Sequence, residues 1–481
     1  MTRALVLAGT GSGCGKTSVA LGLMRAFSRR GLLVQPFKAG PDFIDPGLHA
    51  AAAGRMSHNL DTWMLPEAAL RAGFARQARD ADVVIVEGVM GLFDGRGGGS
   101  RGADEAGSTA HLAKMLGLPV ILVVDAASQA RSAAAVVLGF AHFDPKLTLA
   151  GVLLNRVASP RHEALLRAAL ALVPDVPLLG CLPRAEALSL ASRHLGLVTA
   201  EDCVHEEGGL DARLEALADW VEQGLDVPAL LASLPELSLS DIGLPPARPE
   251  VQAPPAAPRV VRIGLARDRA FCFTYAENLR LLEAAGAELV PFSPLTESRL
   301  PETLDGLYLP GGYPELSAAE LAANTPMLAA IRAFCASGRP VWAECGGFMY
   351  LQRSLVDSEG AEHSLCGVFP ARALMRSRRA ALGYREARTL APGPFGPAGT
   401  VLRGHEFHYS ELEPGGPVSG GKGQPAFALT AADGSQTLDG AAQGNVVGGY
   451  FHAHLASNPE VAQAFVAACL AARIASGGQG A

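Results

Sequence analysis

The chain has 481 residues, of which 49% are hydrophobic and 18% charged, so buried cores are expected and disorder is excluded as the main state. At about 150 residues per domain, this length suggests two large domains or three smaller ones. The 40 basic and 47 acidic residues leave a net charge of -7, which argues against a nucleic-acid-binding protein and against a polybasic membrane binder. No apolar run approaches the ~18 residues that a membrane-spanning helix needs.

Eight cysteines are scattered along the chain without a CxxC pair or a disulfide-like spacing. In a chain of this size, that pattern indicates free thiols in a reducing cytoplasm. The N-terminal apolar run leads into a glycine loop rather than a cleavage site, so it predicts a first strand and not a signal peptide. The sequence leaves the oligomeric state open, a homodimer included.

The first half alternates short β-rich runs with helical stretches. These runs are nearly continuous Val, Leu, Ile and Ala, which is typical of strands buried on both faces of a parallel sheet. A stripe of Val19, Leu23 and Phe27 predicts a helix that lies on this sheet. The predicted strands are Ala4–Ala8, Leu33–Phe37, Val83–Val86, Val120–Val124, Ala150–Leu154 and Val176–Leu179.

A proline-rich segment divides the chain. Residues 244–258 include six prolines in fifteen residues, which predicts an extended linker. A second βα pattern follows it, with β-rich runs at 261–266, 288–292, 306–312 and 341–345 and helical runs at 277–286 and near 326–336. The sequence therefore predicts an α/β protein with domains over 1–243 and 259–481 joined by a linker at 244–258.

The first chemical motif is the glycine loop AGTGSGCGKTS at 8–18, which follows a predicted strand and opens a predicted helix. Glycines let the backbone close around phosphate oxygens, and the helix N-terminus adds positive partial charge. Lys16 would reach the outer phosphates and Thr17 would hold Mg²⁺. The match to the phosphate-loop pattern is imperfect, because Thr10 stands where the first glycine belongs and Gly9 comes one position early.

Acidic residues follow the predicted strands of the same half. Glu87 stands at the carboxyl end of an apolar run, where open α/β sheets place their sites, and it predicts a second Mg²⁺ contact. Lys38, Asp42 and Asp45 come just after the second strand. Asp42 and Asp45 could face one ligand from a single helical turn, but Gly-Pro-Asp and Asp-Pro are also strong turn formers. From spacing alone, both interpretations stand.

The segment VWAECGGFMYL at 341–351 reads as a strand, a sharp Cys-Gly-Gly turn and an apolar helix. This is the pattern of a nucleophile elbow, with Cys345 as the nucleophile. The helix N-terminus is expected to lower the pKa of its thiol. Gly312 in LPGGYPE, together with Gly346, could supply the backbone N–H groups of an oxyanion hole.

A cysteine nucleophile needs a base, and VVGGYFHAHLASNP at 446–459 offers His452 and His454 on or just after a strand, on the same face. The segment GHEFHYS at 404–410 fits equally an amphipathic strand and a binding surface. In the glycine-rich stretch GLFDGRGGGSRG, Arg96 and Arg101 could clamp substrate carboxylates, or they could be ordinary surface arginines.

The order of these motifs covers the whole chain. It runs through the shifted phosphate loop, KAGPDFIDP, VEGVMGLFDG, the linker, LPGGYPE, AECGG, GHEFHYS and YFHAHLASNP. This order resembles the cobyrinic acid a,c-diamide synthase family, including its members that act on hydrogenobyrinic acid. The first half is similar to dethiobiotin synthetase and the second to class I glutaminases.

The resemblance implies a dethiobiotin synthetase-like P-loop synthetase domain over 1–243 and a class I glutamine amidotransferase domain over 259–481. The second domain would release ammonia from glutamine. The first would use ATP and Mg²⁺ to phosphorylate the a and c acetates of a corrin acid, with or without cobalt, and ammonia would then displace the phosphate.

The resemblance also implies roles for single residues. Thr17 and Glu87 would contact Mg²⁺, with Asp42, Asp45 and Asp94 as acids near the metal and the reacting carboxylate. Lys38 would steady the transferred phosphoryl group and Asn155 would read adenine. Cys345 would be the nucleophile and His452 the base. The glutaminase relatives carry Glu two residues after the base, whereas this chain has His454, so a dyad and a triad with an unusual third member both remain open. The ATP loop would comprise Thr10, Gly11, Ser12, Gly13, Cys14, Gly15, Lys16 and Thr17.

Two alternatives compete with this interpretation. Cobyric acid synthase has a similar architecture and amidates other corrin side chains, but GPDFIDP and the HxH ending favour the diamide synthase. A regulatory P-loop ATPase with a degenerate glutaminase module is the second alternative, and the presence of both Cys345 and His452 argues against it.

Overall fold

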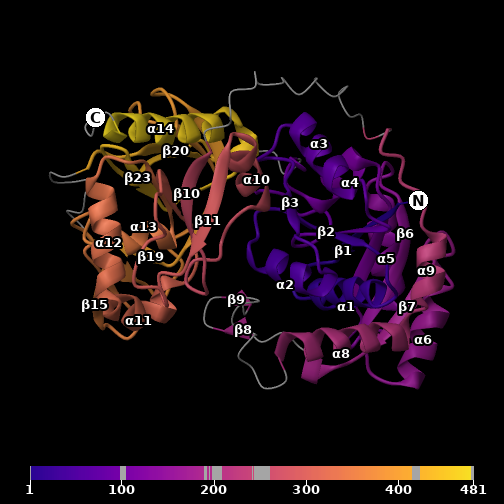
Figure 1. The fold of residues 1–481 in the computed structure, drawn as a ribbon. Coiled ribbons are helices and arrows are strands. Elements are labelled where there is room, and N and C mark those ends of the chain that lie inside the picture. The colour runs from indigo at the N-terminus through magenta and orange to yellow at the C-terminus, as the bar shows by residue number, and fades with distance from the viewer. Residues whose placement is uncertain are drawn as a thin grey trace. The chain divides into compact units, whose positions relative to one another are not determined.

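The computed structural model describes residues 2–97, 104–188, 192–193, 196–197, 209–240, 242, 260–413 and 423–477. The chain forms two compact units, with the main division between Glu250 and Val251 (Figure 1). Arg101 lies outside the described residues, as does the whole predicted linker at 244–258.

The N-terminal unit is built on a parallel sheet that has seven strands in the described part of the chain, in the order β3-β2-β4-β1-β5-β6-β7. Its central strands are almost entirely buried, because nearly every residue is apolar and helices cover both faces. The strands are β1 (Arg3–Gly9), β2 (Val34–Ala39), β3 (His58–Leu60), β4 (Val83–Glu87), β5 (Val120–Asp125), β6 (Leu149–Val157) and β7 (Leu178–Pro183), with a separate pair β8 (Ser192–Arg193) and β9 (Gly196–Leu197).

Helices connect these strands and complete the core. Val19, Leu23 and Phe27 are fully buried, which confirms the predicted apolar stripe of α1. Helix α8 packs along α1 (Figure 1). The helices are α1 (Lys16–Ser28), α2 (Ile44–Ala53), α3 (Glu67–Ala78), α4 (Thr109–Leu116), α5 (Ser132–Phe143), α6 (Pro160–Leu170), the short η1 (Glu186–Leu188), α8 (Gly209–Gly224) and α9 (Val227–Ser233).

The C-terminal unit is centred on a second sheet, in the order β11-β10-β12-β13-β23-β22, in which the described strands are parallel except for β22. Two smaller sheets flank it, in the orders β15-β14-β16-β19 and β21-β20-β17-β18-β24. The prediction of an α/β protein is therefore confirmed. The sheet β21-β20-β17-β18-β24 was not predicted, apart from the strand expected at 404–410.

The strands of this unit are β10 (Val261–Ala266), β11 (Ala287–Phe292), β12 (Gly306–Leu309), β13 (Val341–Glu344), β14 (Ser354–Val356), β15 (Glu362–Ser364), β16 (Arg372–Met375), β17 (Ala381–Thr389), β18 (Val401–His408), β19 (Ser410–Leu412), β20 (Phe427–Ala431), β21 (Gln436–Asp439), β22 (Ala441–Gln443), β23 (Val446–Gly449) and β24 (His452–Ala453). The helices are α10 (Ala276–Ala284), η2 (Pro314–Ser317), α11 (Ala318–Ala323), α12 (Thr325–Ala336), α13 (Gly346–Tyr350), η3 (Leu455–Ser457) and α14 (Glu460–Gly477).

Candidate active sites

The glycine loop lies between β1 and α1, as predicted. Gly13 and Gly15 have φ of 77° and 96°, a backbone conformation that favours glycine. A Cβ on Gly9 would lie 2.4 Å from Cys14 Sγ and 2.9 Å from Lys16 Cδ, so this early glycine is needed for close packing inside the loop. Lys16 Nζ donates to the carbonyl oxygens of Gly11 at 3.0 Å and Met90 at 2.6 Å.

Glu87 ends β4 inside the N-terminal unit, beside the loop. Its Oε1 accepts hydrogen bonds from Thr17 Oγ1 at 2.7 Å and Lys38 Nζ at 2.9 Å, and its Oε2 lies 2.6 Å from His49 Nε2. Burial by itself opposes ionisation, but the Lys38 charge and the bonds from His49 and Thr17 outweigh it and hold the pKa of Glu87 well below its usual range. The Glu87 carboxylate is therefore ionised, and it is paired with the Lys38 ammonium group.

Lys38 lies between two buried acids. Its Nζ is 2.5 Å from Asp45 Oδ2, and although burial opposes its charge, the attraction of Asp45, Glu87 and Asp42 raises its pKa. Burial and the neighbouring Asp42 and Glu87 raise the pKa of Asp45 in turn. Asp42 precedes α2, and its Oδ1 accepts a bond from the backbone N–H of Ile44 at 2.7 Å. Asp42 thus makes the local turn that one interpretation predicted, and it also lies beside Asp45. That both acids face one ligand stays a prediction.

These residues fit a Mg²⁺ ion of the phosphate-loop kind. Among the described residues, no three His, Cys, Asp or Glu side chains form a closed metal site. Mg²⁺ at a nucleotide site normally takes only one or two protein ligands and completes its shell with phosphates and water. The Thr17 hydroxyl and Glu87 Oε1 lie together, and Asp45 Oδ1 is buried without a hydrogen-bond partner among the described residues.

Asp94 and Arg96 follow in the loop after β4. Asp94 Oδ2 accepts a bond from the Gly91 N–H at 2.9 Å. Arg96 pairs with Asp104 at 3.1 Å, and its guanidinium lies 5.5 Å from the centre of the Trp63 ring. Arg96 is thus held on its own unit by one acid and one aromatic ring.

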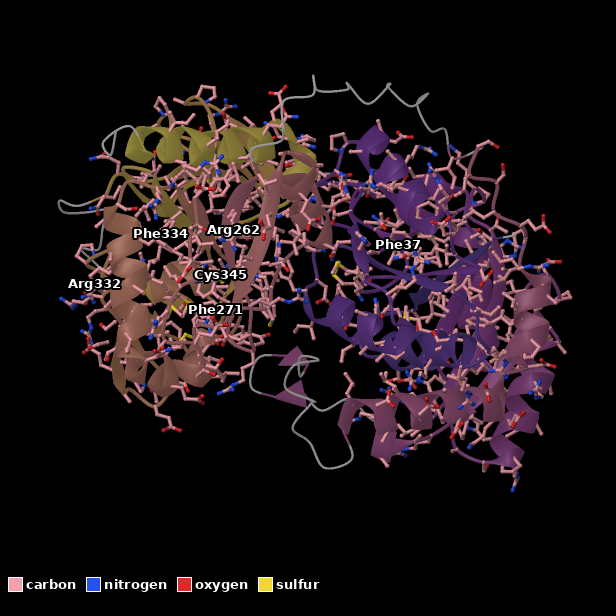
Figure 2. All side chains as sticks on the ribbon, viewed as in Figure 1. Phe37, Arg262, Phe271, Arg332, Phe334 and Cys345 are labelled. Carbon is pink, nitrogen blue, oxygen red and sulfur yellow. The ribbon has the colours of Figure 1, made fainter. Side chains whose placement is uncertain are left out.

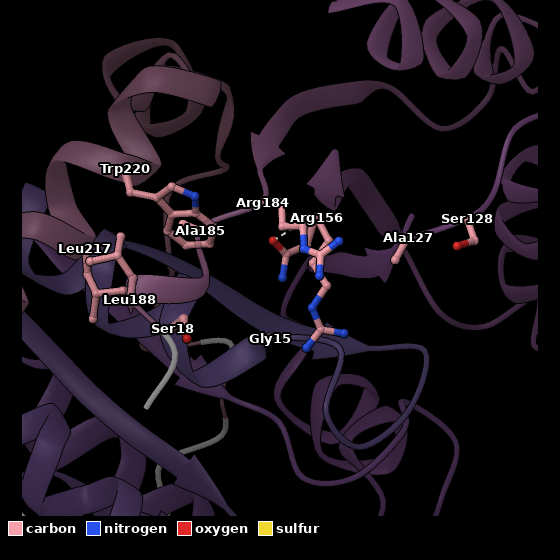
Figure 3. Close-up of a pocket in the computed structure, with 11 residues that line it drawn as sticks. Gly15, Ser18, Ala127, Ser128, Arg156, Arg184, Ala185, Leu188, Leu217 and Trp220 are labelled. Carbon is pink, nitrogen blue, oxygen red and sulfur yellow. Dashed lines mark hydrogen bonds between the residues drawn. The ribbon is translucent and has the colours of Figure 1, made fainter. Parts of the chain in front are cut away.

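A pocket of about 490 Å³ opens beside Gly15 (Figure 3). Asn155 at the end of β6 donates from Nδ2 to Cys14 O at 2.9 Å, and a Cβ on Gly15 would lie 2.2 Å from this Nδ2. The next residue, Arg156, has φ of 61°, pairs with Asp125 and donates to Gly13 O at 2.8 Å. Leu188, Leu217 and Trp220 supply an apolar side of the pocket.

In the C-terminal unit, Cys345 stands between β13 and α13. Its φ of 44° and ψ of -102° are strained for a non-glycine residue, as expected for a nucleophile elbow. Its N–H donates to Gly449 O of the neighbouring strand β23 at 2.7 Å, which fixes the turn. Cys345 is 6% exposed and belongs to an apolar cluster that includes Phe271; Figure 2 labels both.

The expected lowering of the thiol pKa is not found. Burial raises the pKa of Cys345, and the negative charge of nearby Glu315 raises it further. Burial likewise raises the pKa of Glu315 to about 7.

The two glycines that were predicted to form an oxyanion hole lie together. A Cβ on Gly346 would be 3.0 Å from the backbone nitrogen of Gly312 and 2.9 Å from Pro314 Cδ. Gly312 has φ of 157°, and a Cβ there would lie 2.1 Å from Ala270 O. Neither position tolerates a side chain, and both backbones approach the turn that carries Cys345.

The two histidines occupy different environments. His452 on β24 pairs with His405 on β18, and the two rings stack at 5.1 Å. Burial and the neighbouring His405 and His408 hold the pKa of His452 well below its usual range. His454 lies beyond the strand, packs on the Tyr275 ring at 4.5 Å, and accepts a bond from the Ala456 N–H at 3.3 Å, so it caps η3. Residues 404–408 form the end of β18 and Ser410 begins β19, so the predicted strand is two strands of different sheets. His405 on β18 lies beside the candidate base.

Sequence reasoning missed the side chains that hold the histidine segment. Glu344 Oε1 accepts a bond from the Ala453 N–H at 2.8 Å, and its Oε2 accepts one from Tyr308 at 2.7 Å. Asn278 donates to Ala453 O at 2.7 Å and accepts a bond from the Leu455 N–H at 2.7 Å. These two side chains bond to both backbone groups of Ala453, between the histidines, and to the N–H of Leu455 just after them.

Two family models match the chain. The CobQ/CobB/MinD/ParA nucleotide binding domain matches residues 5–198, and the CobB/CobQ-like glutamine amidotransferase domain matches residues 262–460. No described helix is both long enough and apolar enough to span a bilayer.

Curated relatives match nearly the whole chain. It is 47% identical over 469 residues to a cobyrinate a,c-diamide synthase of Syntrophotalea carbinolica, with 97% of this chain and 98% of the relative covered. It is 45% identical over 470 residues to the cobyrinate a,c-diamide synthase of Salmonella typhimurium, with the same coverage. It is also 47% identical over 452 residues to a hydrogenobyrinate a,c-diamide synthase of Rhodobacter capsulatus, with 94% of this chain and 98% of the relative covered.

Proposed function

The chain belongs to the family of cobyrinate and hydrogenobyrinate a,c-diamide synthases, and from this premise we propose how its residues divide the reaction between two sites. It is a ligase that uses ATP and glutamine to amidate the a and c acetates of a corrin acid. The observation that carries the division is that the Thr17–Glu87 pair and the Cys345 elbow lie in separate compact units.

The N-terminal site activates the carboxylate. A carboxylate does not react with ammonia at neutral pH, because it is a poor electrophile and has no good leaving group. Its oxygen therefore attacks the γ-phosphorus of ATP, ADP leaves, and an acyl phosphate forms. Ammonia then attacks the acyl carbon, and phosphate leaves. The cycle runs once for each acetate.

In this proposal the glycine loop and Lys16 bind the ATP phosphates, and Asn155 and the pocket beside it receive the base. Lys38 neutralises charge on the transferred phosphoryl group. Asp45 and Asp94 lie near the reacting carboxylate. The pocket volume and its apolar Leu217 and Trp220 side support a site for a nucleobase.

Bound Mg²⁺ would neutralise negative charge on the ATP phosphates and on the phosphoryl group in transfer. We assign Thr17 and Glu87 as its protein contacts, with Asp42 and Asp45 close by. Two observations support this assignment. The low pKa of Glu87 keeps its carboxylate ionised, and the Thr17 hydroxyl is hydrogen-bonded to Oε1 of that carboxylate, so two oxygen ligands lie together.

The C-terminal site releases ammonia. The raised thiol pKa of Cys345 and the lowered imidazole pKa of His452 make both groups neutral at rest. As Sγ attacks the glutamine amide carbon, its proton passes to His452 and then to the leaving nitrogen, and neutral ammonia departs. Water hydrolyses the thioester to glutamate. The N–H groups of Gly312 and Gly346 would stabilise the oxyanion, each worth about 3 kcal/mol.

Arg96 is proposed as a contact for the carboxylates of the corrin acid, because a guanidinium pairs with them in a bidentate manner. Its present partner Asp104 is 45% exposed, so the pair can exchange for a substrate carboxylate at little cost. Replacement of Arg96 by Ala should raise the KM for the corrin acid and leave the KM for glutamine unchanged.

The seven cysteines in the described residues are free, which supports a reducing compartment such as the cytoplasm. Both proposed sites are made of residues of this one chain. A homodimer stays a prediction.

An amidation assay with cobyrinic and hydrogenobyrinic acids, read by mass, tests the proposal. Replacement of Cys345 by Ala should abolish product formation from glutamine but leave product formation from added ammonia. The reason is that only glutamine cleavage needs the thiol. Equal loss with both nitrogen sources would refute the division between the sites.

A further inference from the structure

A buried histidine that the proposed mechanism does not use lies against Glu87. His49 and Glu87 are both fully buried, and His49 Nε2 is 2.6 Å from Glu87 Oε2. The other ring nitrogen, Nδ1, lies 3.2 Å from Ser57 Oγ, which is 3% exposed. The three side chains are thus connected by two hydrogen-bonding contacts, Ser57–His49 and His49–Glu87.

The fold places His49 for this contact. Helix α2 buries Asp45 and His49, which are four residues apart and so lie on one face. Asp45 reaches Lys38 and His49 reaches Glu87, so one helical face serves both ends of the cluster. Ser57 follows α2 and precedes β3, where it meets the ring from the other side.

The two oxygens of Glu87 have different partners. Oε1 accepts hydrogen bonds from Thr17 and Lys38, whereas Oε2 is hydrogen-bonded to His49. Because Thr17 is on the Oε1 side, a cation shared between Thr17 and Glu87 must bind at Oε1. The imidazole fixes the carboxylate plane so that Oε1 keeps this direction.

We infer that His49 is a positioning residue for Glu87, that it donates its Nε2–H to Oε2, and that the Ser57 hydroxyl donates to Nδ1 and so selects this tautomer. The inference rests on the proposed role of Glu87 in Mg²⁺ binding. Side chains that hold a metal ligand in this way commonly change metal affinity or activity 10- to 100-fold when they are removed.

The test uses Mg²⁺-dependent binding of a non-hydrolysable ATP analogue to the full chain, measured by titration calorimetry without corrin acid or glutamine. Glutamine places an amide nitrogen the same number of bonds from Cα as Nε2, whereas asparagine matches Nδ1. We therefore expect His49→Gln to keep the Mg²⁺ dependence within about 3-fold, and His49→Asn to weaken it about 10-fold or more.

A role limited to filling space or bonding Ser57 predicts the opposite order, because only Asn keeps a group near Ser57. Equal affinities for Gln and Asn, or an unchanged His49→Asn, overturn the inference. His111→Asn is the matched control, since that ring contacts the Thr62 hydroxyl at 3.0 Å in the same unit. It should leave the Mg²⁺ dependence unchanged, and a similar loss there also overturns the inference.

The Ser57→Ala variant keeps the His49 ring and removes the hydroxyl that selects its tautomer. It therefore tests the inference even if the His49 variants do not fold. We expect a loss of Mg²⁺ dependence of about 3-fold or more, and unchanged binding overturns the inference. Failure of the proposed function looks different. If the unmodified chain binds the analogue equally with and without Mg²⁺, the assignment of Glu87 to the metal is wrong, and the inference falls with it.

Discussion

At the scale of single residues, His452 and His454 lie two residues apart in sequence, and we assign them different tasks. A general base contributes about 10²–10⁴-fold to rate, so His452→Ala should reduce glutamine hydrolysis by that factor. His454 caps η3, and loss of such a cap costs about 1 kcal/mol of stability. His454→Ala should therefore lower the melting temperature and slow hydrolysis less. Glutamate release and a thermal melt on both variants check this, and a larger rate loss for His454 would reverse the assignment.

Glu344 should make folding stability depend on pH. Burial raises its pKa from 4.5 to about 8, although the bonds from Ala453 and Tyr308 oppose the rise. Between pH 4.5 and about pH 8, Glu344 keeps a proton in the folded chain that it releases in the unfolded chain. The contribution of Glu344 to stability therefore falls as the pH rises through this range. Each pKa unit corresponds to about 1.4 kcal/mol.

Replacement of Glu344 by Gln should remove this dependence, because the amide keeps an oxygen for the Ala453 N–H and cannot ionise. Urea unfolding at pH 5 and pH 8 measures it. The free energy of unfolding of the Glu344→Gln variant minus that of the unmodified chain should be larger at pH 8 than at pH 5. A constant difference would show that Glu344 ionises normally in the fold.

At the scale of elements, the loop after β12 packs against the imidazole of His452, the proposed base. A Cβ on Gly311 would lie 2.4 Å from His452 Cε1, so Gly311→Ala must move the imidazole. A displacement of about 1 Å can cost roughly 10²-fold in rate. Glutaminase kcat should fall accordingly, whereas Gly393→Ala, which has open space around its Cβ position, should have no effect. Full activity of Gly311→Ala would place the base elsewhere.

Strands buried on both faces were predictable because their apolar runs are continuous. Residues Val83–Val86 and Val120–Val124 fall within β4 and β5. The three-residue edge strand β3 carries no such signal. Strand β17 was missed because it has few apolar residues in succession, ALGYREART, and few of them are buried.

The same distinction holds for the sites. The glycine loop and the Cys345 elbow are recognisable because a local turn requires small residues at fixed spacing. The hydrogen-bond partners of three side chains lie far away in sequence, 38 residues for His49, 109 for Glu344 and 177 for Asn278. No local sequence pattern can predict such contacts. The thiol pKa was predicted in the wrong direction, because burial depends on the whole unit and not on the helix that follows Cys345.

At the scale of the whole molecule, the two chemistries should be separable by substitution. Acyl-phosphate formation precedes amidation whichever nitrogen source is used, so Lys16→Ala should suppress synthesis from both glutamine and ammonia. Glutamine hydrolysis should persist, because the glutaminase residues belong to the other unit. Parallel measurements of ADP, glutamate and amide product check this. Normal amidation from ammonia would show that Lys16 takes no part in ATP use.

The burial of Cys345 also bears on how the protein withstands oxidative stress. Peroxide attacks thiolates, and sulfenic acid forms fastest where a cysteine is both ionised and exposed. At rest Cys345 is neither, since its side chain is enclosed and its pKa is raised. Many catalytic cysteines are activated in advance and are damaged for that reason. If Cys345 is the nucleophile, we expect its reactive form to arise only during turnover, so that the resting thiol reacts slowly with peroxide.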